Sequence, residues 1–416
     1  MTSQSCPFVI DPSGRDIHGE AAKLRALGRV TKAELPGEVL VWWVTDHALI
    51  KQLLTDSRVS KDTYQHWPAW GNGESELAKT WPLAIWVADR NMITAYGAEH
   101  IRLRKLVAKA FTARRTAAMR PRIESITAEL LDRLAEHEPG KVVDLRAEFA
   151  YPLPVQVISE LLGVPDEIRD KLLDVVHSIM QTTASLEKAK ANENRLYDLL
   201  GELVAIKRDQ PGDDLTTGLI QVADDGAGGL SERELVDTVL LMFTAGHETT
   251  VNLFDQAIYA ILTYEDLGHM VRRGEANWED VIEETLRLEA PFANLPLRYA
   301  VENIELDELT IAKGDPIVIA FGAAGRDLLL HGEAADQFDV ARPTRREHLA
   351  FGYGVHHCPG APLARLEAAI GLPALFNRFP GLALAESPDR LQPLESFISN
   401  GHRTLPVTLR GGFNRS

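Results

Sequence analysis

The ten residues Phe351–Gly360, FGYGVHHCPG, contain Cys358, one of only two cysteines in the 416-residue chain. The other, Cys6, lies in a polar N-terminal stretch, so a disulfide framework is not expected. Pro359 and Pro362, followed by residues with helix-compatible periodicity, predict that a helix begins directly after the cysteine. The N–H groups and the dipole at such a helix start favour a thiolate. The surrounding glycines would let the backbone approach a flat ligand closely.

Two common site patterns do not account for this motif. Gly352 and Gly354 are not followed by the third glycine of a dinucleotide-binding loop. His356, His357 and Cys358 are consecutive, so they cannot easily converge on one zinc ion. A thiolate that faces a planar ligand, in contrast, is a good soft axial donor for haem iron. Taken alone, the motif also fits a buried structural cysteine in a glycine-rich turn.

Helical periodicity dominates the rest of the chain. Residues 231–264 form a long helical pattern that starts at Ser231, with Glu234 three residues later, as in a capping box. Its middle is apolar nearly all round, which predicts a helix through the core. Further helices are expected over 100–115, 126–137 and 193–209, and short strands over 39–44, 315–321 and 404–409. The sequence predicts one mainly α domain with a small β region (α+β), spanning 1–416, with a mobile N-terminal tail at about 1–15.

Composition narrows the function classes. Lys and Arg number 44 and Asp and Glu 60, so the formal net charge of −16 gives no electrostatic support for nucleic-acid binding. No stretch approaches the 18 or so uninterrupted apolar residues of a membrane helix, and the N-terminus lacks the features of a signal peptide. We therefore expect a cytoplasmic protein, a monomer, with no membrane or nucleic-acid partner.

Considered as a whole, FGYGVHHCPG resembles the haem-binding signature of the cytochromes P-450, the cysteine-thiolate haem monooxygenases. The matching positions are Phe351, Gly352, Gly354, His356, Cys358 and Gly360. The resemblance covers the chain from about residue 20 to its end. It includes Glu284 and Arg287 in EETLR, with Arg342 as third member, a set that is buried and structural in this family. The resemblance implies haem b bound between the long helix of 231–264 and the cysteine loop, with Cys358 as the axial ligand of the iron.

The long helix also carries AGHETT, in which three residues match the family's oxygen-activating segment. Ala245 leaves room for dioxygen beside the helix. Glu248 and Thr249 resemble the family's acid–alcohol pair, which delivers protons to oxygen in a site that otherwise excludes water. The alternative for the pair is a threonine bonded to its own helix backbone and a glutamate on a solvated face.

The same resemblance implies the partners of the haem carboxylates. His100 and Arg104, one helical turn apart in HIRLR, join Arg298 and His356 as cationic donors to the two propionates, because buried carboxylates need fixed cations. Gly360 is expected to lie against the cofactor. Taken singly, each of the four donors would more commonly be a surface charge.

The substrate side is predicted from apolar segments above the haem. The expected pocket residues are Trp86, Val239, Met242, Phe292, Leu295 and Phe397. They suit a bulky apolar or aromatic molecule, such as a natural product of antibiotic or other secondary metabolism, or a steroid. Tryptophans 67, 70, 81 and 86 lie in the 63–96 region, where they could instead pack the lid.

Electrons must come from another protein, since no flavin or nicotinamide domain is present. Residues 101–122 carry eight Lys or Arg and no acid, which predicts a basic docking face for a ferredoxin fed by NAD(P)H through a ferredoxin reductase. A solvated helix face is the alternative. The expected reaction is hydroxylation, with dioxygen and two electrons. Oxidative coupling of aromatic rings (phenol or indole) on the same fold and a non-catalytic haem gas sensor are the alternatives.

Overall fold

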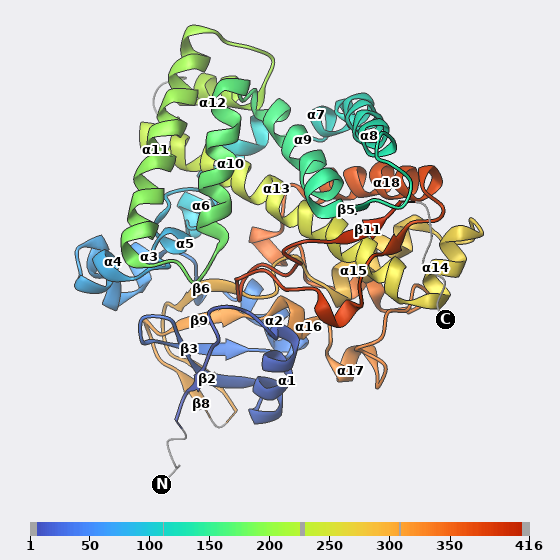
Figure 1. The fold of residues 1–416 in the computed structure, drawn as a ribbon. Coiled ribbons are helices and arrows are strands. Elements are labelled where there is room, and N and C mark those ends of the chain that lie inside the picture. The colour runs from blue at the N-terminus through green and yellow to red at the C-terminus, as the bar shows by residue number, and fades with distance from the viewer. Residues whose placement is uncertain (1–5, 111, 225–228, 308, 410–416) are drawn as a thin grey trace.

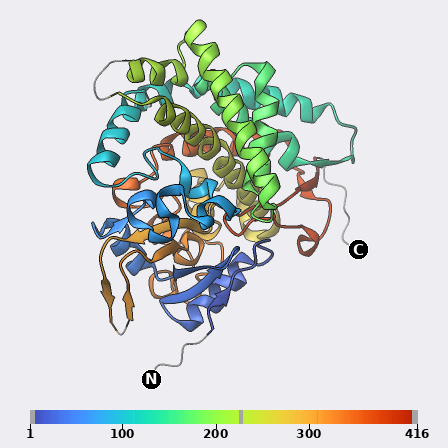
Figure 2. The same cartoon turned by 90° about the vertical axis from the view of Figure 1, so that its left-hand side faces the viewer.

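The computed structural model describes residues 6–110, 112–224, 229–307 and 309–409. The strands β2, β3, β6, β8 and β9 lie at the lower end of the molecule, whereas β5 and β11 lie near α13 and α18, where helices predominate (Figure 1). The view turned by 90° shows the β7–β8 hairpin projecting from the strand-rich end (Figure 2). The mainly helical architecture with a small β region agrees with the fold class predicted from the sequence.

The largest sheet has six strands in the order β1-β2-β3-β9-β6-β4. Its strands are β1 (Phe8–Val9), β2 (Val30–Leu35), β3 (Val39–Val44), β4 (Val59–Ser60), β6 (Leu295–Ala300) and β9 (Pro316–Ile319). A three-stranded sheet contains β5 (Val142–Asp144), β10 (Ala383–Leu384) and β11 (Pro406–Thr408), and a two-stranded sheet pairs β7 (Ile304–Leu306) with β8 (Leu309–Ile311). The strands predicted over 39–44, 315–321 and 404–409 are thus confirmed as β3, β9 and β11.

The helices of the N-terminal half are α1 (Ile17–Leu27), α2 (His47–Thr55), α3 (Thr63–His66), α4 (Glu76–Thr80), α5 (Ile85–Ala88), α6 (Gly97–Ala110), α7 (Ala113–Ala118), α8 (Arg120–Ala135), α9 (Pro152–Leu162), α10 (Asp166–Met180) and α11 (Leu186–Asp209). Those of the C-terminal half are α12 (Leu215–Asp224), α13 (Glu232–Thr263), α14 (Glu265–Arg272), α15 (Trp278–Leu288), α16 (Phe321–Ala324), α17 (Leu328–His331) and α18 (Ala361–Arg378). Short turns of other helix types are η1 (Pro68–Gly73), η2 (Arg146–Ala150), η3 (Arg345–Glu347), η4 (Gly354–His356) and η5 (Pro388–Arg390). None of the helices among the described residues is both long and apolar enough to cross a bilayer.

Two local expectations differ from the structure. Residues 6–15 were expected within a mobile tail, but β1 pairs with β2, and Ile10 is only 2% exposed. The single helix expected over 100–115 is instead two, α6 and α7. Thr112 ends the continuity because its hydroxyl accepts from the N–H of Arg115 and so caps a new helix.

The long helix α13 runs through the core as predicted. Its N-terminus is closed by the capping box of Ser231 and Glu234. In its middle, α9 packs so closely that a Cβ on Gly246 would lie 2.6 Å from the Cδ1 atom of Ile158. This position therefore needs glycine for close packing, and α13 is held at a fixed depth against α9.

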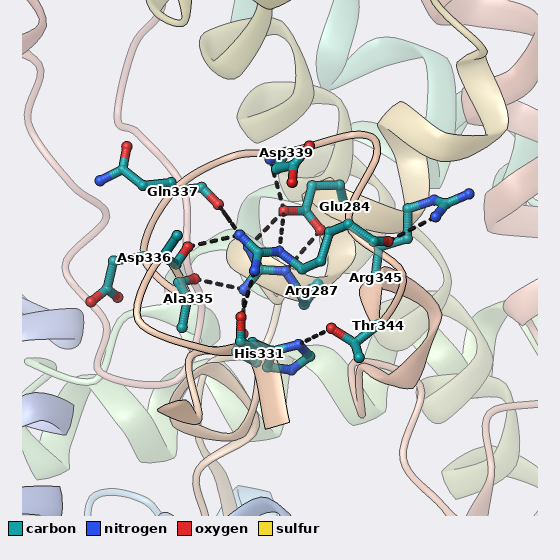
Figure 3. A network of polar contacts seen from close by, with 12 residues as sticks. Glu284, Arg287, His331, Ala335, Asp336, Gln337, Asp339, Thr344 and Arg345 are labelled. Atoms are coloured by element: carbon teal, nitrogen blue, oxygen red, sulfur yellow. Dashed lines mark hydrogen bonds and ion pairs between the residues drawn. The ribbon is translucent and has the colours of Figure 1, made fainter. Parts of the chain in front are cut away.

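A buried ionic network joins α15 to the segment after α17 (Figure 3). Glu284 and Arg287 are fully buried, and their closest ion-pair atoms lie 2.6 Å apart. Arg342 adds a second contact to Glu284, at 3.2 Å. Further N–H groups of the two guanidinium groups donate to the backbone carbonyls of Gly325, His331, Ala334, Ala335 and Gln337. The network is structural, as the sequence predicted, because every member has a partner within the protein.

Candidate active site

A large cavity lies between the middle of α13 and the loop that carries Cys358. Its volume, counted as room for the centres of water molecules, is about 270 Å³. The wall from α13 includes Ala245 and Thr249, and the opposite wall includes Phe351, Cys358 and Gly360. Ala245 is exposed although it belongs to a core helix, which places it at the cavity surface. Most of the lining is apolar, so the cavity suits a flat, mainly apolar group.

The cysteine loop reaches the cavity through a glycine turn. Gly352 and Gly354 have φ values of +70° and +71°, in the left-handed region that favours glycine. A Cβ on Gly354 would also lie 2.7 Å from the carbonyl oxygen of Leu54. The N–H of Cys358 donates to the carbonyl of Phe351 at 2.8 Å, which fixes the loop. α18 then begins at Ala361, directly after the cysteine as the sequence predicted.

The thiol of Cys358 is unbonded to other cysteines and borders the cavity. Burial raises its pKa, although the N–H groups of Gly360 and Ala361 and the charges of Arg104 and Arg365 act in the opposite direction. The N–H groups at the helix start thus favour the thiolate, as the sequence led us to expect, while desolvation acts against it. A cation in the cavity would be needed to keep the sulfur ionised.

Four cationic or potentially cationic side chains, His100, Arg104, Arg298 and His356, lie in or beside the cavity wall, and two of them, Arg298 and His356, line the cavity itself. The rings of His100 and His356 lie 4.2 Å apart, centroid to centroid. Arg104 donates to the carbonyl of His357 at 2.7 Å, which ties α6 to the cysteine loop. Arg298, on β6, is 4% exposed. Within the described part of the chain each of the four retains a buried nitrogen without a partner: His100 Nε2, Arg104 Nη1, Arg298 Nη1 and His356 Nδ1.

None of these four groups forms an ion pair with an acidic side chain among the residues that the structure describes. Burial lowers the pKa of Arg298 to about 10, and burial together with neighbouring cations lowers the pKa of His356 to about 2. Burial and the charge of Arg104 also lower the pKa of His100. Buried donors of this kind are normally satisfied, so the cluster is built for anionic groups that arrive with a ligand.

Glu248 and Thr249 are consecutive on α13 but face different spaces. Thr249 borders the main cavity, and its hydroxyl donates to the carbonyl of Ala245 at 2.7 Å. Glu248 is 3% exposed, which rules out the solvated face considered for it, and it accepts from Asn252 Nδ2 at 3.3 Å. It borders a second cavity of about 190 Å³, beside Arg146, whose Nη2 lies 3.9 Å away. The pair therefore spans the wall between two cavities.

The predicted substrate residues are only partly gathered at the cavity. Trp86, Met242, Phe292 and Leu295 line it. Val239 and Phe397 are fully buried but lie outside the lining. Three of the four lid tryptophans pack among themselves, since Trp67 stacks on Trp70 at 5.7 Å and meets Trp81 edge-on at 5.5 Å. That cluster belongs to the core beside β6, so only Trp86 faces the cavity.

The cavity is also lined by three charged residues that were not predicted from the sequence: Lys61, Asp89 and Glu367. Burial raises the pKa of both Asp89 and Glu367 well above the ordinary range. For Glu367 a signal existed, because it lies one helical turn after Leu363 and Ala364 on α18, and all three residues line the cavity. Lys61 and Asp89 follow a short strand and a short helix, where no periodicity points them inward.

The residues present fit a haem. The cavity offers one sulfur donor for iron, an apolar lining for the macrocycle and a cluster of unpaired cationic donors for two carboxylates. No cluster of three His, Cys, Asp or Glu side chains in the described ranges is arranged to hold a metal ion by protein ligands alone.

The comparisons with known proteins agree with this fit. A sequence model of the family described as Cytochrome P450 matches residues 278–399. The 2-hydroxy-5-methyl-1-naphthoate 7-hydroxylase of Streptomyces carzinostaticus is 46% identical over 406 residues, 98% of each chain. The 6-deoxyerythronolide B hydroxylase of Saccharopolyspora erythraea is 37% identical over 398 residues, 94% of this chain and 95% of the relative.

Among solved structures, CYP154A1 from Streptomyces coelicolor A3(2) is 52% identical and superposes with a TM-score of 0.92. The match covers 97% of this chain and 100% of that one. Since relatives this similar span almost the full length of the chain, the fold and the general chemistry of the family extend to it. The chain belongs to the cytochrome P450 family, whose members are haem- and dioxygen-dependent oxidoreductases, and it is a monooxygenase of that family.

Proposed function

We propose that the chain hydroxylates a bulky apolar or aromatic small molecule, with Cys358 as the axial ligand of haem b. The observation that carries this proposal is one cavity lined by the free thiol of Cys358 and by Arg298 and His356, each of which has an unpaired buried nitrogen. His100 and Arg104, which also keep unpaired buried nitrogens, lie behind that lining, beside His356 and His357. Haem, when bound, supplies the chemistry that activates dioxygen and inserts one oxygen atom into a C–H bond. The protein's own residues supply binding, orientation and protons.

Cys358 and the cationic cluster hold the cofactor in this proposal. The iron's charge favours the thiolate that burial alone disfavours, and the N–H groups of Gly360 and Ala361 stabilise the sulfur's charge. His100, Arg104, Arg298 and His356 take the two propionates as charge-assisted hydrogen-bond partners. Binding at both places orients the macrocycle against Ala245 and Gly360.

Proton delivery is assigned to Glu248 and Thr249. Glu248 Oε1 takes protons from water in the second cavity, where Arg146 and Asn252 hold the carboxylate in place. Thr249 Oγ1 has a partner in the Ala245 carbonyl and can hold one further hydrogen bond in the main cavity. Because the two residues are consecutive on α13, a proton crosses the wall between the cavities with little exposure of the main cavity to water.

The substrate class rests on the cavity lining and on the relatives. Trp86, Met242, Phe292 and Leu295 present apolar surface on the side away from Cys358. The two relatives reported above are named for a naphthoate and for 6-deoxyerythronolide B. These names support a natural product as the class of substrate, and they do not single out one compound. Aromatic coupling loses its main support because Trp67, Trp70 and Trp81 pack in the core.

The electron donor is proposed to be a ferredoxin reduced by NAD(P)H through its reductase, in the cytoplasm. Lys105, Lys109 and Arg114 are exposed and make no ion pair with any residue in the described ranges. Arg104 ties this stretch to the loop that carries Cys358, so a partner that bound these basic side chains would dock near that loop. Four other cations of 101–122 are already paired: Arg102, Arg115, Arg120 and Arg122. The docking face is thus smaller than the sequence suggested.

The reduced, CO-bound protein tests the haem assignment. Wild type should show the strongly red-shifted Soret band of thiolate-ligated haem, and Cys6→Ser should keep it, since Cys6 is exposed and remote. Cys358→Ala and Cys358→Ser should both lose the red shift. A red-shifted band that survives in both Cys358 variants would overturn the assignment.

Product analysis tests the reaction class. With an accepted substrate, the product should gain the mass of one oxygen, whereas coupling would give a dimer less two hydrogens. Thr249→Ala should still bind haem and consume NADPH, but it should form less product per NADPH and release more hydrogen peroxide, because its hydroxyl no longer positions the proton donor. Thr249→Ser, which retains the hydroxyl, is the matched control. Unchanged coupling of NADPH to product in Thr249→Ala would contradict the proton-delivery role.

A further inference from the structure

Lys61 is a buried lysine with an unusual location. It follows β4, and β4 pairs with β6 so that Ser60 lies opposite Tyr299, one residue beyond Arg298. Lys61 is 6% exposed and lines the main cavity. Lysine side chains are almost never fully buried unless they are paired. A buried lysine that borders a ligand cavity therefore calls for a partner.

In the described part of the chain, Lys61 lies without a partner for its charge. Its ammonium makes no hydrogen bond and no ion pair with any other residue in the described ranges. The adjacent carboxylate of Asp62 is used elsewhere, since it caps α3 by accepting from the N–H of Gln65 at 2.9 Å. Burial lowers the pKa of Lys61 well below its ordinary value, and the charge of Arg298 lowers it further.

The cavity's own acids do not supply the missing charge either. The pKa of Asp89 is raised mainly by burial and by the charge of Asp237, and the pKa of Glu367 is raised by burial, so both carboxyls favour the neutral form. The charge of Lys61 does act on His356, where it is the strongest of the neighbouring cations. Lys61 therefore belongs electrostatically to the cluster of Arg298 and His356.

We propose that Lys61 is a fifth partner of the haem carboxylates and binds a propionate beside Arg298 and His356. This inference rests on the haem site proposed above and adds to it a residue outside the sequence motifs. A carboxylate next to the ammonium restores the ionised form of the lysine, because an opposite charge within a few ångströms favours it. Lys61 is a cofactor-binding residue in this scheme and takes no part in proton delivery.

Lys61 also changes the balance of charge around the cofactor. Lys61, Arg104 and Arg298 would place three fixed cations against the two carboxylates of one haem. The surplus positive charge favours the reduced iron, which carries one more electron than the oxidised iron. Removing the lysine should therefore lower the reduction potential as well as weaken haem binding, whereas a residue that only fills space would change neither by its charge.

A carboxylate could also come from a substrate, since the name of one relative's substrate is a naphthoate. The propionate is favoured for two reasons. Lys61 directly follows β4, which pairs with the strand that carries Arg298, and its charge lowers the pKa of His356. The two sources are separated by working without substrate. A lysine that serves only a substrate acid would leave haem retention in the substrate-free protein unchanged.

The test compares haem-loaded wild type with Lys61→Met, which keeps the length of the side chain but removes the charge, and with Lys61→Arg, which keeps the charge. The readouts are the rate of haem transfer to excess apomyoglobin and the reduction potential, both without substrate. Lys61→Met should lose haem about tenfold faster or more and have a more negative potential. Lys61→Arg should stay within about threefold of wild type. Lys32→Met, which removes an exposed lysine from the ring of Trp42, should match wild type.

Wild-type transfer rate and wild-type potential in Lys61→Met would overturn the proposal. If Lys61→Met folds poorly, Lys61→Gln gives the same comparison with a neutral hydrogen-bond donor. A Lys61→Met protein that has native circular dichroism but retains no haem supports the proposal. Failure of the underlying site would be distinct, because wild type itself would then lack the red-shifted CO spectrum.

Discussion

Guanidinium groups are buried in two regions of the molecule, the network of Glu284, Arg287 and Arg342 and the cationic cluster beside the main cavity. The two regions differ in whether these groups have hydrogen-bond partners within the protein. Arg287 and Arg342 have partners for their buried nitrogens inside the protein, as carboxylate or carbonyl oxygens. Arg104 and Arg298 each keep a buried nitrogen without one, among the residues that the structure describes. Figure 3 shows the first arrangement, with the donors directed at surrounding carbonyls.

Whether a buried cation has an acceptor within the protein distinguishes residues that stabilise the fold from residues that bind a ligand. A buried cation without an acceptor raises the free energy of the protein alone, and only a bound anion can offset that. Burial by itself therefore says little about function. The presence or absence of a partner within the chain is the informative observation, and it can be tested by truncating one cation from each region.

The largest effect on folding should come from Arg287→Ala. The change removes the closer of the two arginine partners of fully buried Glu284 and takes the side-chain donor from the carbonyls of Gly325 and Ala335, so the free energy of unfolding should fall by about 3–5 kcal/mol. Urea unfolding followed by circular dichroism measures it. Arg346→Ala, which breaks an exposed pair with Glu279 at 3.0 Å, should cost about 1 kcal/mol or less. Equal losses in the two variants would remove the contrast between buried and exposed pairs.

Arg298→Met should act on the cofactor and much less on the fold. A propionate left without its cation should weaken haem binding by about 2–5 kcal/mol, seen as faster transfer to apomyoglobin. Arg298→Lys restores the charge without the planar fork and should recover part of the loss. The comparison breaks if Arg298→Met lowers the free energy of unfolding as much as Arg287→Ala while retaining haem normally.

Acid should destabilise the protein through His331, beside the structural network. Burial and the charges of Arg287, His47 and Arg342 lower its pKa to about 4 from 6.5. Between pH 6.5 and 4 the unfolded chain binds a proton that the folded chain does not. The stability contributed by the neutral ring is thus lost as the pH falls below 6.5, by up to about 1.4 kcal/mol per pH unit.

His331→Gln isolates this effect, because glutamine cannot titrate but can still bond to Thr344, now 2.8 Å from His331 Nδ1. Urea unfolding at pH 7 and pH 5.5 should show a smaller pH dependence for the variant than for wild type. An identical pH dependence of the two proteins would mean that His331 does not contribute to the loss of stability in acid. The cations of Arg287 and Arg342 would then have no measurable effect on the neighbouring imidazole.

The smallest effect on stability is expected for the exposed cations. Lys105→Glu and Lys109→Glu should leave unfolding unchanged, since neither residue has an ion-pair partner in the described ranges. Reduction by a ferredoxin should nevertheless slow several-fold and depend less on salt, because electrostatic steering acts at long range. Reduction by dithionite should not change. Lys32→Glu, on strand β2, is the control. If it slows reduction by ferredoxin as much, the docking site does not lie in residues 101–122.

Much of the fold was readable because its signals are local. The capping box of Ser231 and the long apolar pattern of 231–264 specify α13, and Pro359 and Pro362 place the start of α18. The break between α6 and α7 was missed because the periodicity continues through Thr112 although its hydroxyl caps a new helix. Residues 8–9 were missed because a two-residue strand has no pattern of its own and depends on its pairing with β2.

The site was readable only where a motif marks it. Cys358 and its neighbours lie in one stretch, and the sequence placed them correctly at one loop. The different directions of Glu248 and Thr249 depend on which neighbouring elements leave space, and sequence spacing does not report that. Lys61 lies far from every motif, and only the pairing of β4 with β6 brings it to Arg298.

The spread of the cavity residues along the chain has a consequence for biosynthesis. Lys61, His100 and Arg104 come first along the sequence, Arg298 follows almost two hundred residues after Arg104, and His356 and Cys358 come last. Synthesis proceeds from the N-terminus at about 5–20 residues per second, so the proposed iron ligand reaches the nascent protein last. Lys61, His100, Arg104 and Arg298 can therefore take their places in the nascent chain before His356 and Cys358, and the proposed haem site is complete only after the cysteine loop has been synthesised.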